Sequence, residues 1–159
     1  MGLLALLACG DEKTAAPLYD LAQLDAEMQD YEQWEQVAPW VGVRPSCDGA
    51  HGAYVQVWVN AVARADLEAG ATTFSEGAIW VKEGYQDAGI TPKGIDAMRK
   101  VEGWDSAAGD WFWGHYSDEG EPVASGHVSG CVPCHSDGVD FVLTVEAFVA
   151  ETPSDCPFP

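Results

Sequence analysis

Residues 131–135 carry the clearest chemistry in this sequence. They read Cys-Val-Pro-Cys-His, so two thiols lie three positions apart and an imidazole follows directly. Two cysteines at this spacing share one helical turn, and each can add to a vinyl group of a haem while the adjacent histidine ligates the iron. The motif predicts one covalently attached haem c, with Cys131 and Cys134 as attachment points and His135 as the axial iron ligand.

Two other kinds of site use closely spaced cysteines. A thioredoxin-type redox pair belongs at the start of a helix in an early βαβ unit, whereas this motif lies near the C-terminus of a chain without that alternation. A structural zinc site needs a second close pair of ligands, and Cys47 and Cys156 are isolated from one another. The sequence context therefore favours haem over both alternatives.

The sixth coordination position of the iron decides between electron transfer and ligand binding. No Met, His or Lys follows His135, so the downstream methionine of small electron carriers is absent. An axial ligand from the protein would have to lie upstream of the motif, and an open or water-bound iron is the simpler expectation. The upstream candidates are His51, Met98, His115 and His127.

Hydrophobic periodicity predicts the elements that position this motif. Apolar residues recur at near-helical spacing from Leu18 to Trp34, which predicts an amphipathic helix. A loop rich in Pro and Gly should span residues 39–52. Alternation predicts a strand over 54–59, and residues 61–69 favour a short helix that Gly70 ends.

Three further strands are expected before the motif. Residues 77–85 alternate, with Ile79 and Val81 on one face and Trp80 and Lys82 on the other. Residues 95–101 and the aromatic segment 110–116 give the other two, and a terminal helix is expected over 144–150. These elements predict an α+β fold, an antiparallel β-sheet packed with a few helices and carrying the C-terminal haem c motif.

The charge of the chain limits its partners. Seven Lys and Arg residues stand against 26 Asp and Glu residues, for a formal net charge of -19 in 159 residues. Such a chain would repel nucleic acid. The acidic surface suits a basic redox protein as partner, or it serves solubility alone.

The first residues resemble a bacterial lipoprotein signal. The uncharged start ends in Leu-Ala-Cys, which predicts lipidation of Cys9, export to the periplasm or cell envelope, and membrane attachment only through this anchor. After Cys9, Cys131 and Cys134, only Cys47 and Cys156 remain of five cysteines. They could form one disulfide in an oxidising compartment, or remain two buried thiols.

From His51 onward the chain resembles the cytochrome P-460 and cytochrome c'-β family. The resemblance covers roughly the last two thirds of the chain, and the order of the matching stretches carries it. It implies a mainly antiparallel sheet and a five-coordinate haem c whose free face binds nitric oxide, carbon monoxide or hydroxylamine. The stretches are His51-Gly52 before VQVWVN, then FSEGAIWVKEGY, IDAMRKVEGW, DWFWGHY and GHVSGCVPCHSDGVDFVLT.

The resemblance also implies a chemical division. Hydroxylamine-oxidising members carry a bond between a lysine and the haem ring, whereas c'-β members bind gases without it. Lys82 is the candidate for that lysine, although its stem could instead cover Trp80 while its head reaches water or a haem propionate. Arg44 and Arg99 are candidate propionate partners, but each could equally be a surface charge, and surface pairing is favoured for Arg99. The indoles of Trp80, Trp111 and Trp113 could cap the haem face or belong to the core. We assign no role to the carboxylates of Glu83, Glu102 and Asp140, because Asp and Glu are so abundant in this chain that their presence needs no functional reason.

These observations divide the chain into a leader and tether over residues 1–17 and a haem domain over 18–159. The first functional hypothesis is an exported mono-haem c-type cytochrome that binds small ligands such as nitric oxide and takes part in redox chemistry. The second is a hydroxylamine oxidase with Lys82 bound to the haem, and the third is an electron carrier with a ligand such as Met98. A homodimer is compatible with each hypothesis.

Overall fold

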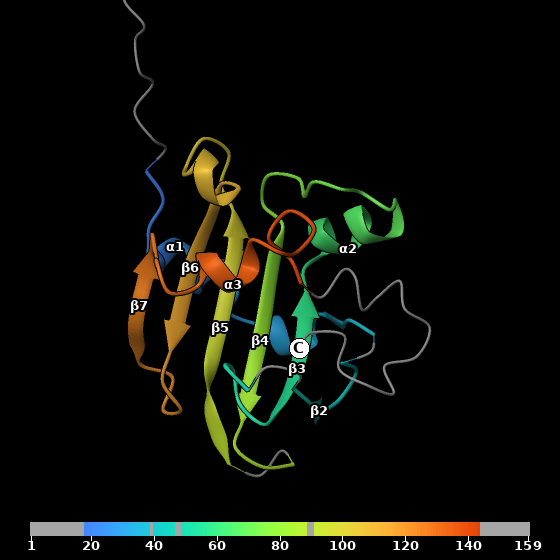
Figure 1. Cartoon of the computed structure of the whole chain (residues 1–159), viewed down its shortest axis with the longest axis vertical. Coiled ribbons are helices and arrows are strands. Elements are labelled where there is room, and N and C mark those ends of the chain that lie inside the picture. The colour runs from blue at the N-terminus through green and yellow to red at the C-terminus, as the bar shows by residue number, and fades with distance from the viewer. Residues whose placement is uncertain (1–17, 39, 47–48, 89–90, 144–159) are drawn as a thin grey trace, which may run out of the picture.

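An antiparallel sheet forms the centre of the molecule, with helices on both of its faces (Figure 1). This computed structural model describes residues 18–38, 40–46, 49–88 and 91–143. The predicted α+β fold is confirmed. Its elements are α1 (Leu21–Glu27), the 3-10 helix η1 (Tyr31–Gln33), β1 (Glu35–Gln36), β2 (Arg44–Pro45), β3 (Tyr54–Val59), α2 (Ala61–Glu68), β4 (Ile79–Tyr85), β5 (Pro92–Lys100), the 3-10 helix η2 (Ser106–Ala108), β6 (Trp111–Tyr116), β7 (Pro122–Gly126) and α3 (Val132–His135).

The strand register brings distant residues into rows across the sheet. The strands follow the order β1-β3-β4-β5-β6-β7, β2 also pairs with β3, and all these pairs are antiparallel. Directly opposite residues share a face of the sheet. One row consists of Val57, Lys82, Asp96 and His115, and the next consists of Val59, Trp80, Met98 and Trp113.

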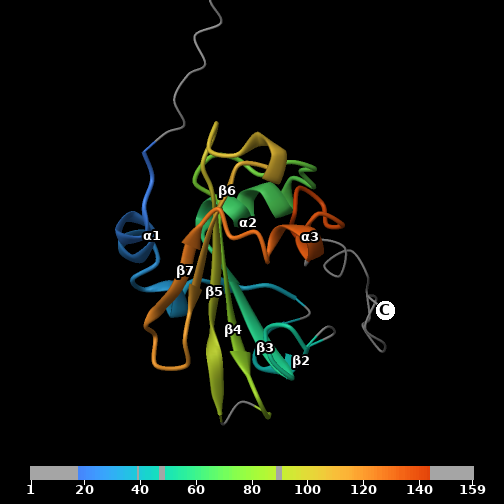
Figure 2. The same cartoon turned by 60° about the vertical axis from the view of Figure 1, so that its left-hand side comes forward.

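Each face of the sheet buries its own core. Leu24 of α1 packs with Ile79, Val81 and Phe112 on one face. Trp80 and Trp113 lie on the other face, where α2 and α3 are found (Figure 2). The alternation predicted for 77–85 and 110–116 is thus confirmed, because successive side chains of a strand point to opposite faces.

The first helix is shorter than its hydrophobic pattern predicts. It begins after Asp20, whose side chain accepts a hydrogen bond from the Gln23 backbone in a capping box, and it ends at Glu27. A separate 3-10 turn carries Tyr31, whose ring packs against Trp58 at a centroid distance of 5.3 Å. The prediction of one helix from Leu18 to Trp34 is wrong, because the chain must turn there for β1 to reach the edge of β3.

The strand predicted over 54–59 is present with the same ends, and the other predicted helix and strands that fall in the described residues have shifted ends. Helix α2 ends before Gly70, which has the positive φ of 65° that favours glycine after a helix. Three strands were not predicted: β1, which follows the predicted first helix, β2, which lies within the predicted loop, and β7. Strand β7 reads Pro-Val-Ala-Ser-Gly and is largely exposed, so it lacks the apolar alternation of the central strands. The helix predicted over 144–150 lies outside the described residues.

Candidate haem site

A cavity of about 480 Å³ lies on the face of the sheet that carries α3. This volume is the empty space between the lining atoms, and it includes space that is open to solvent. Both rows of the sheet contribute to its wall, and Cys131 and His135 line it from the other side. The residues that line it include His51, Trp80, Lys82, Asp96, Met98, Trp113, Cys131 and His135.

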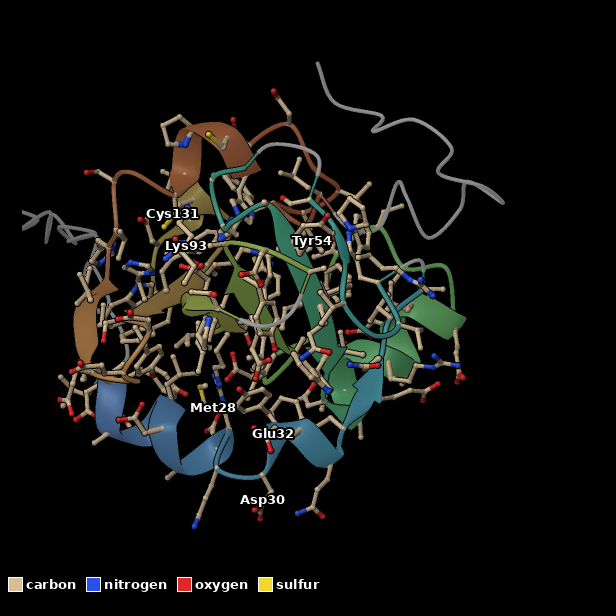
Figure 3. The ribbon with its side chains drawn as sticks, turned by 90° about the horizontal axis from the view of Figure 1, so that it is seen from below. Met28, Asp30, Glu32, Tyr54, Lys93 and Cys131 are labelled. Carbon is tan, nitrogen blue, oxygen red and sulfur yellow. The ribbon has the colours of Figure 1, made fainter. Side chains whose placement is uncertain are left out.

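The single turn α3 presents the Cys-Val-Pro-Cys-His motif to this cavity. Pro133 lies in the first turn, where its missing N–H removes no helical hydrogen bond. The half-buried Cys131 lines the cavity and Cys134 is exposed. Figure 3 shows Cys131 on the opposite side of the sheet from Met28, which follows α1.

The His135 ring is oriented by a backbone carbonyl. Its Nδ1 lies 2.8 Å from the carbonyl oxygen of Phe141, and its ring lies edge-on to Trp113 at a centroid distance of 4.7 Å. A carbonyl can only accept, so Nδ1 carries the proton and Nε2 has the lone pair of the neutral ring. Metal-bound histidines commonly have this arrangement, in which one ring nitrogen binds the metal and the other donates to an oxygen.

The Cys131 thiol is unsuited to thioredoxin-type chemistry. Burial, followed by the nearby Asp96 and Cys134, raises the pKa of Cys131 to about 11, whereas redox-active cysteines depend on a lowered pKa. Within the described residues, no group of three or more His, Cys, Asp or Glu side chains could hold a metal ion.

Asp96 joins two histidines at the polar end of the cavity. Its carboxylate oxygens lie 2.6 Å from Nδ1 of His51 and 2.7 Å from Nδ1 of His115. Burial alone would raise the pKa of Asp96, but the hydrogen bonds and positive charge of the two histidines outweigh burial and lower it. Asp96 was not predicted as a site residue, because its only signal in the sequence is a carboxylate within an otherwise strand-like segment.

A comparison with family models supplies the classification. The model of the family described as Cytochrome P460 matches residues 28–144. The chain belongs to the cytochrome P460 family. The predicted membership of the cytochrome P-460 family is therefore confirmed, and the cytochrome binds haem. A search of the curated proteins finds no match to the chain.

The walls of the cavity fit a haem in this P460-family cytochrome. Trp80 and Trp113 line the cavity, and their buried indole N–H groups find no acceptor among the described residues. Buried donors are normally paired, so these two indoles fit a bound group that carries acceptor oxygens. Trp111 is not among the lining residues. Its indole N–H instead donates to the Asp140 carbonyl at 2.8 Å. The expected role of Trp111 at the haem face is therefore wrong.

The upstream candidates for a sixth ligand divide into two groups. His51 and Met98 line the cavity, and the His51 ring lies 6.1 Å from the His135 ring between centroids. His115 and His127 are not among the lining residues. His127 instead stacks on Trp104 and lies 2.9 Å from Asp105.

The remaining predicted residues occupy different places. Lys82 lines the cavity from β4, whereas Arg44 is exposed on β2 and is not among the lining residues. Arg99 is not a propionate partner: it lies on the α1 face of the sheet and pairs with Glu27 and Glu76, which confirms the favoured alternative of ion pairing. Cys9, Cys47 and Cys156 lie outside the described residues, so the lipidation and the disulfide stay predictions. No helix of the described chain is long and apolar enough to cross a membrane.

Asp96→Asn should destabilise the cytochrome in a pH-dependent way. The folded state depresses the pKa of Asp96, so its contribution is present above the unfolded pKa and is lost as the pH falls through the folded pKa. We expect a loss of about 1.5–3 kcal/mol at neutral pH, typical of hydrogen bonds to a charged group. Urea unfolding of both proteins from neutral pH to pH 3 measures the difference. A constant difference across that range would contradict this account.

Proposed function

We propose that this chain is an exported mono-haem c-type cytochrome whose iron binds small ligands such as nitric oxide on an open face. The hydrogen bond between His135 Nδ1 and the Phe141 carbonyl carries the proposal, since it leaves Nε2 as the metal-binding nitrogen. The adjacent thiols of Cys131 and Cys134 supply the spacing for two thioether bonds. The large apolar side chains of Trp80, Met98 and Trp113 favour a diatomic ligand.

Each part of the cavity has a separate task in this proposal. Cys131 and Cys134 would hold the haem covalently, and His135 would bind its iron. The bound haem would supply the site for small ligands and the one-electron chemistry. The buried side chains of Trp80, Met98 and Trp113 give the cavity an apolar wall. Asp96 orients His51 through its Nδ1, so His51 presents its opposite ring nitrogen for polar contacts.

A hydroxylamine oxidase is the second candidate, and the position of Lys82 favours it. Lys82 lines the same cavity and lies opposite Asp96 in the register of β4 and β5. An amine beside a carboxylate could support the lysine-to-haem bond and the proton transfers of such an oxidation. A simple electron carrier with Met98 as the sixth ligand is the third candidate, because Met98 is buried at the cavity wall.

Absorption spectra of the matured holoprotein distinguish the three candidates. A ferrous high-spin haem c spectrum that carbon monoxide shifts is the expected result. A strongly red-shifted ferrous band that Lys82→Arg removes and Lys93→Arg retains, with a peptide mass that joins Lys82 to the haem, would establish the oxidase instead. Lys93 suits the control because it is exposed and donates to the backbone oxygens of Gly49 and Ala50. A low-spin spectrum that ignores carbon monoxide would leave the electron carrier.

The cell envelope is the compartment that we propose for this cytochrome. The Leu-Ala-Cys sequence at Cys9 supports a lipid anchor, and the formal net charge of -19 supports a basic redox partner. Fractionation of cells that express the wild type and Cys9→Ala tests the anchor. Recovery of both proteins in the same fraction would contradict it.

A further inference from the structure

The segment after α3 has an unusual backbone conformation beside His135. Asp140 and Phe141 follow one another with φ values of 48° and 65°. Asp tolerates this left-handed region, whereas a bulky residue such as Phe rarely adopts it unless its surroundings impose it. The Phe141 carbonyl, which orients His135, therefore depends on contacts that hold the segment in place.

Those contacts come from a buried ion pair. Lys100 Nζ lies 2.8 and 2.7 Å from the two carboxylate oxygens of Asp140, and both side chains are only 10% exposed. Lys100 also donates to the Gly109 carbonyl at 2.7 Å, and the Asp140 carboxylate accepts from the Phe74 backbone N–H at 2.7 Å. The Asp140 carboxylate thus has a positive charge and a backbone N–H donor beside it.

Trp111 and Gly109 hold the backbone on either side of the Phe141 carbonyl. The Trp111 indole donates to the Asp140 carbonyl at 2.8 Å. The Phe141 ring lies so close to Gly109 that a Cβ at that position would stand 2.5 Å from the ring atom Cδ2. Strands β5 and β6 therefore position the carbonyl that accepts from His135 Nδ1.

We propose that Lys100 and Asp140 are positioning residues for His135, and that through the Phe141 carbonyl they set the reduction potential of the haem. This inference rests on the proposed function, in which His135 ligates the iron. A firm hydrogen bond from Nδ1 makes the imidazole a stronger donor, which favours ferric over ferrous iron and lowers the potential. Releasing the segment weakens that bond and raises the potential.

Two holoprotein variants test this role. Trp111→Phe removes one hydrogen bond and no charge, and the double variant Lys100→Met with Asp140→Leu removes the ion pair without leaving a buried charge. We expect the potential to rise and the iron–histidine stretching frequency of the ferrous protein to fall in both. A tenfold loss of the preference for ferric iron corresponds to about 59 mV in a one-electron couple. If the double variant does not fold, the two measurements on Trp111→Phe alone test the inference.

Arg64→Met is the matched control. Arg64 belongs to an exposed ion-pair group with Glu35 and Glu68 and is not among the residues that line the cavity, so its loss should leave both measurements unchanged. Shifts in Trp111→Phe no larger than in Arg64→Met overturn the inference. His135→Ala separates this result from failure of the proposed function: an unchanged haem spectrum in that variant overturns the ligand assignment itself.

Discussion

Holoprotein that carries His135→Ala should lose its native haem spectrum while the haem stays covalently attached. The imidazole is expected to be the iron ligand because Phe141 O accepts from Nδ1 at 2.8 Å. Loss of an outer partner of a metal-bound histidine already costs about 10–100-fold in affinity or activity, so loss of the ligand should exceed that range. Absorption spectra, the reduction potential and the mass of the intact protein measure the effect.

His127→Ala provides the matched control for this change. His127 is exposed, contacts Trp104 and Asp105, and is not among the residues that line the cavity. Its loss should therefore leave the spectrum unchanged. Added imidazole should partly restore the spectrum of His135→Ala, because it can occupy the site of the lost ring. A wild-type spectrum in His135→Ala would contradict the assignment.

Leu24→Ala should cause a large loss of stability through the α1 face of the sheet. Leu24 is fully buried, and its Cδ2 would stand 2.8 Å from a Cβ built at Gly114 of β6. Truncation of a buried leucine removes apolar contacts and leaves a cavity, which costs about 2–5 kcal/mol. Urea unfolding followed by tryptophan fluorescence measures the difference in the free energy of unfolding.

Leu18→Ala is the same substitution at a residue that is 98% exposed. Surface changes of this kind usually stay within about 0.5 kcal/mol of the wild type. Equal losses in the two variants would show that packing of α1 does not stabilise the sheet.

Features with a short-range signal could be predicted from the sequence. Alternation over 54–59, 77–85 and 110–116 placed side chains on the correct faces, because the period of a strand depends only on neighbouring residues. The helix predicted from Leu18 to Trp34 was too long, because the apolar spacing continues although α1 ends at Glu27. Pairing of β1 with β3 decides that boundary, and this pairing has no local signature.

The surroundings of His135 required the tertiary structure. Its hydrogen-bond acceptor is a backbone carbonyl, which every residue possesses, so no residue type could reveal the role of Phe141. Lys100 and Asp140 lie 40 positions apart, and the abundance of carboxylates concealed the pair. Asp96 was hidden for the same reason until the register placed it between Lys82 and His115.

The sequence by itself predicts where this cytochrome attaches its haem, because the spacing of Cys131, Cys134 and His135 is contained in one helical turn. The order of the segments from His51 onward likewise determined the family. Only the tertiary structure decided which upstream residues share the cavity with His135: His51, Lys82 and Met98 do, and Arg99 does not. The reason is physical, since antiparallel register and the two faces of the sheet govern proximity between residues far apart in the chain.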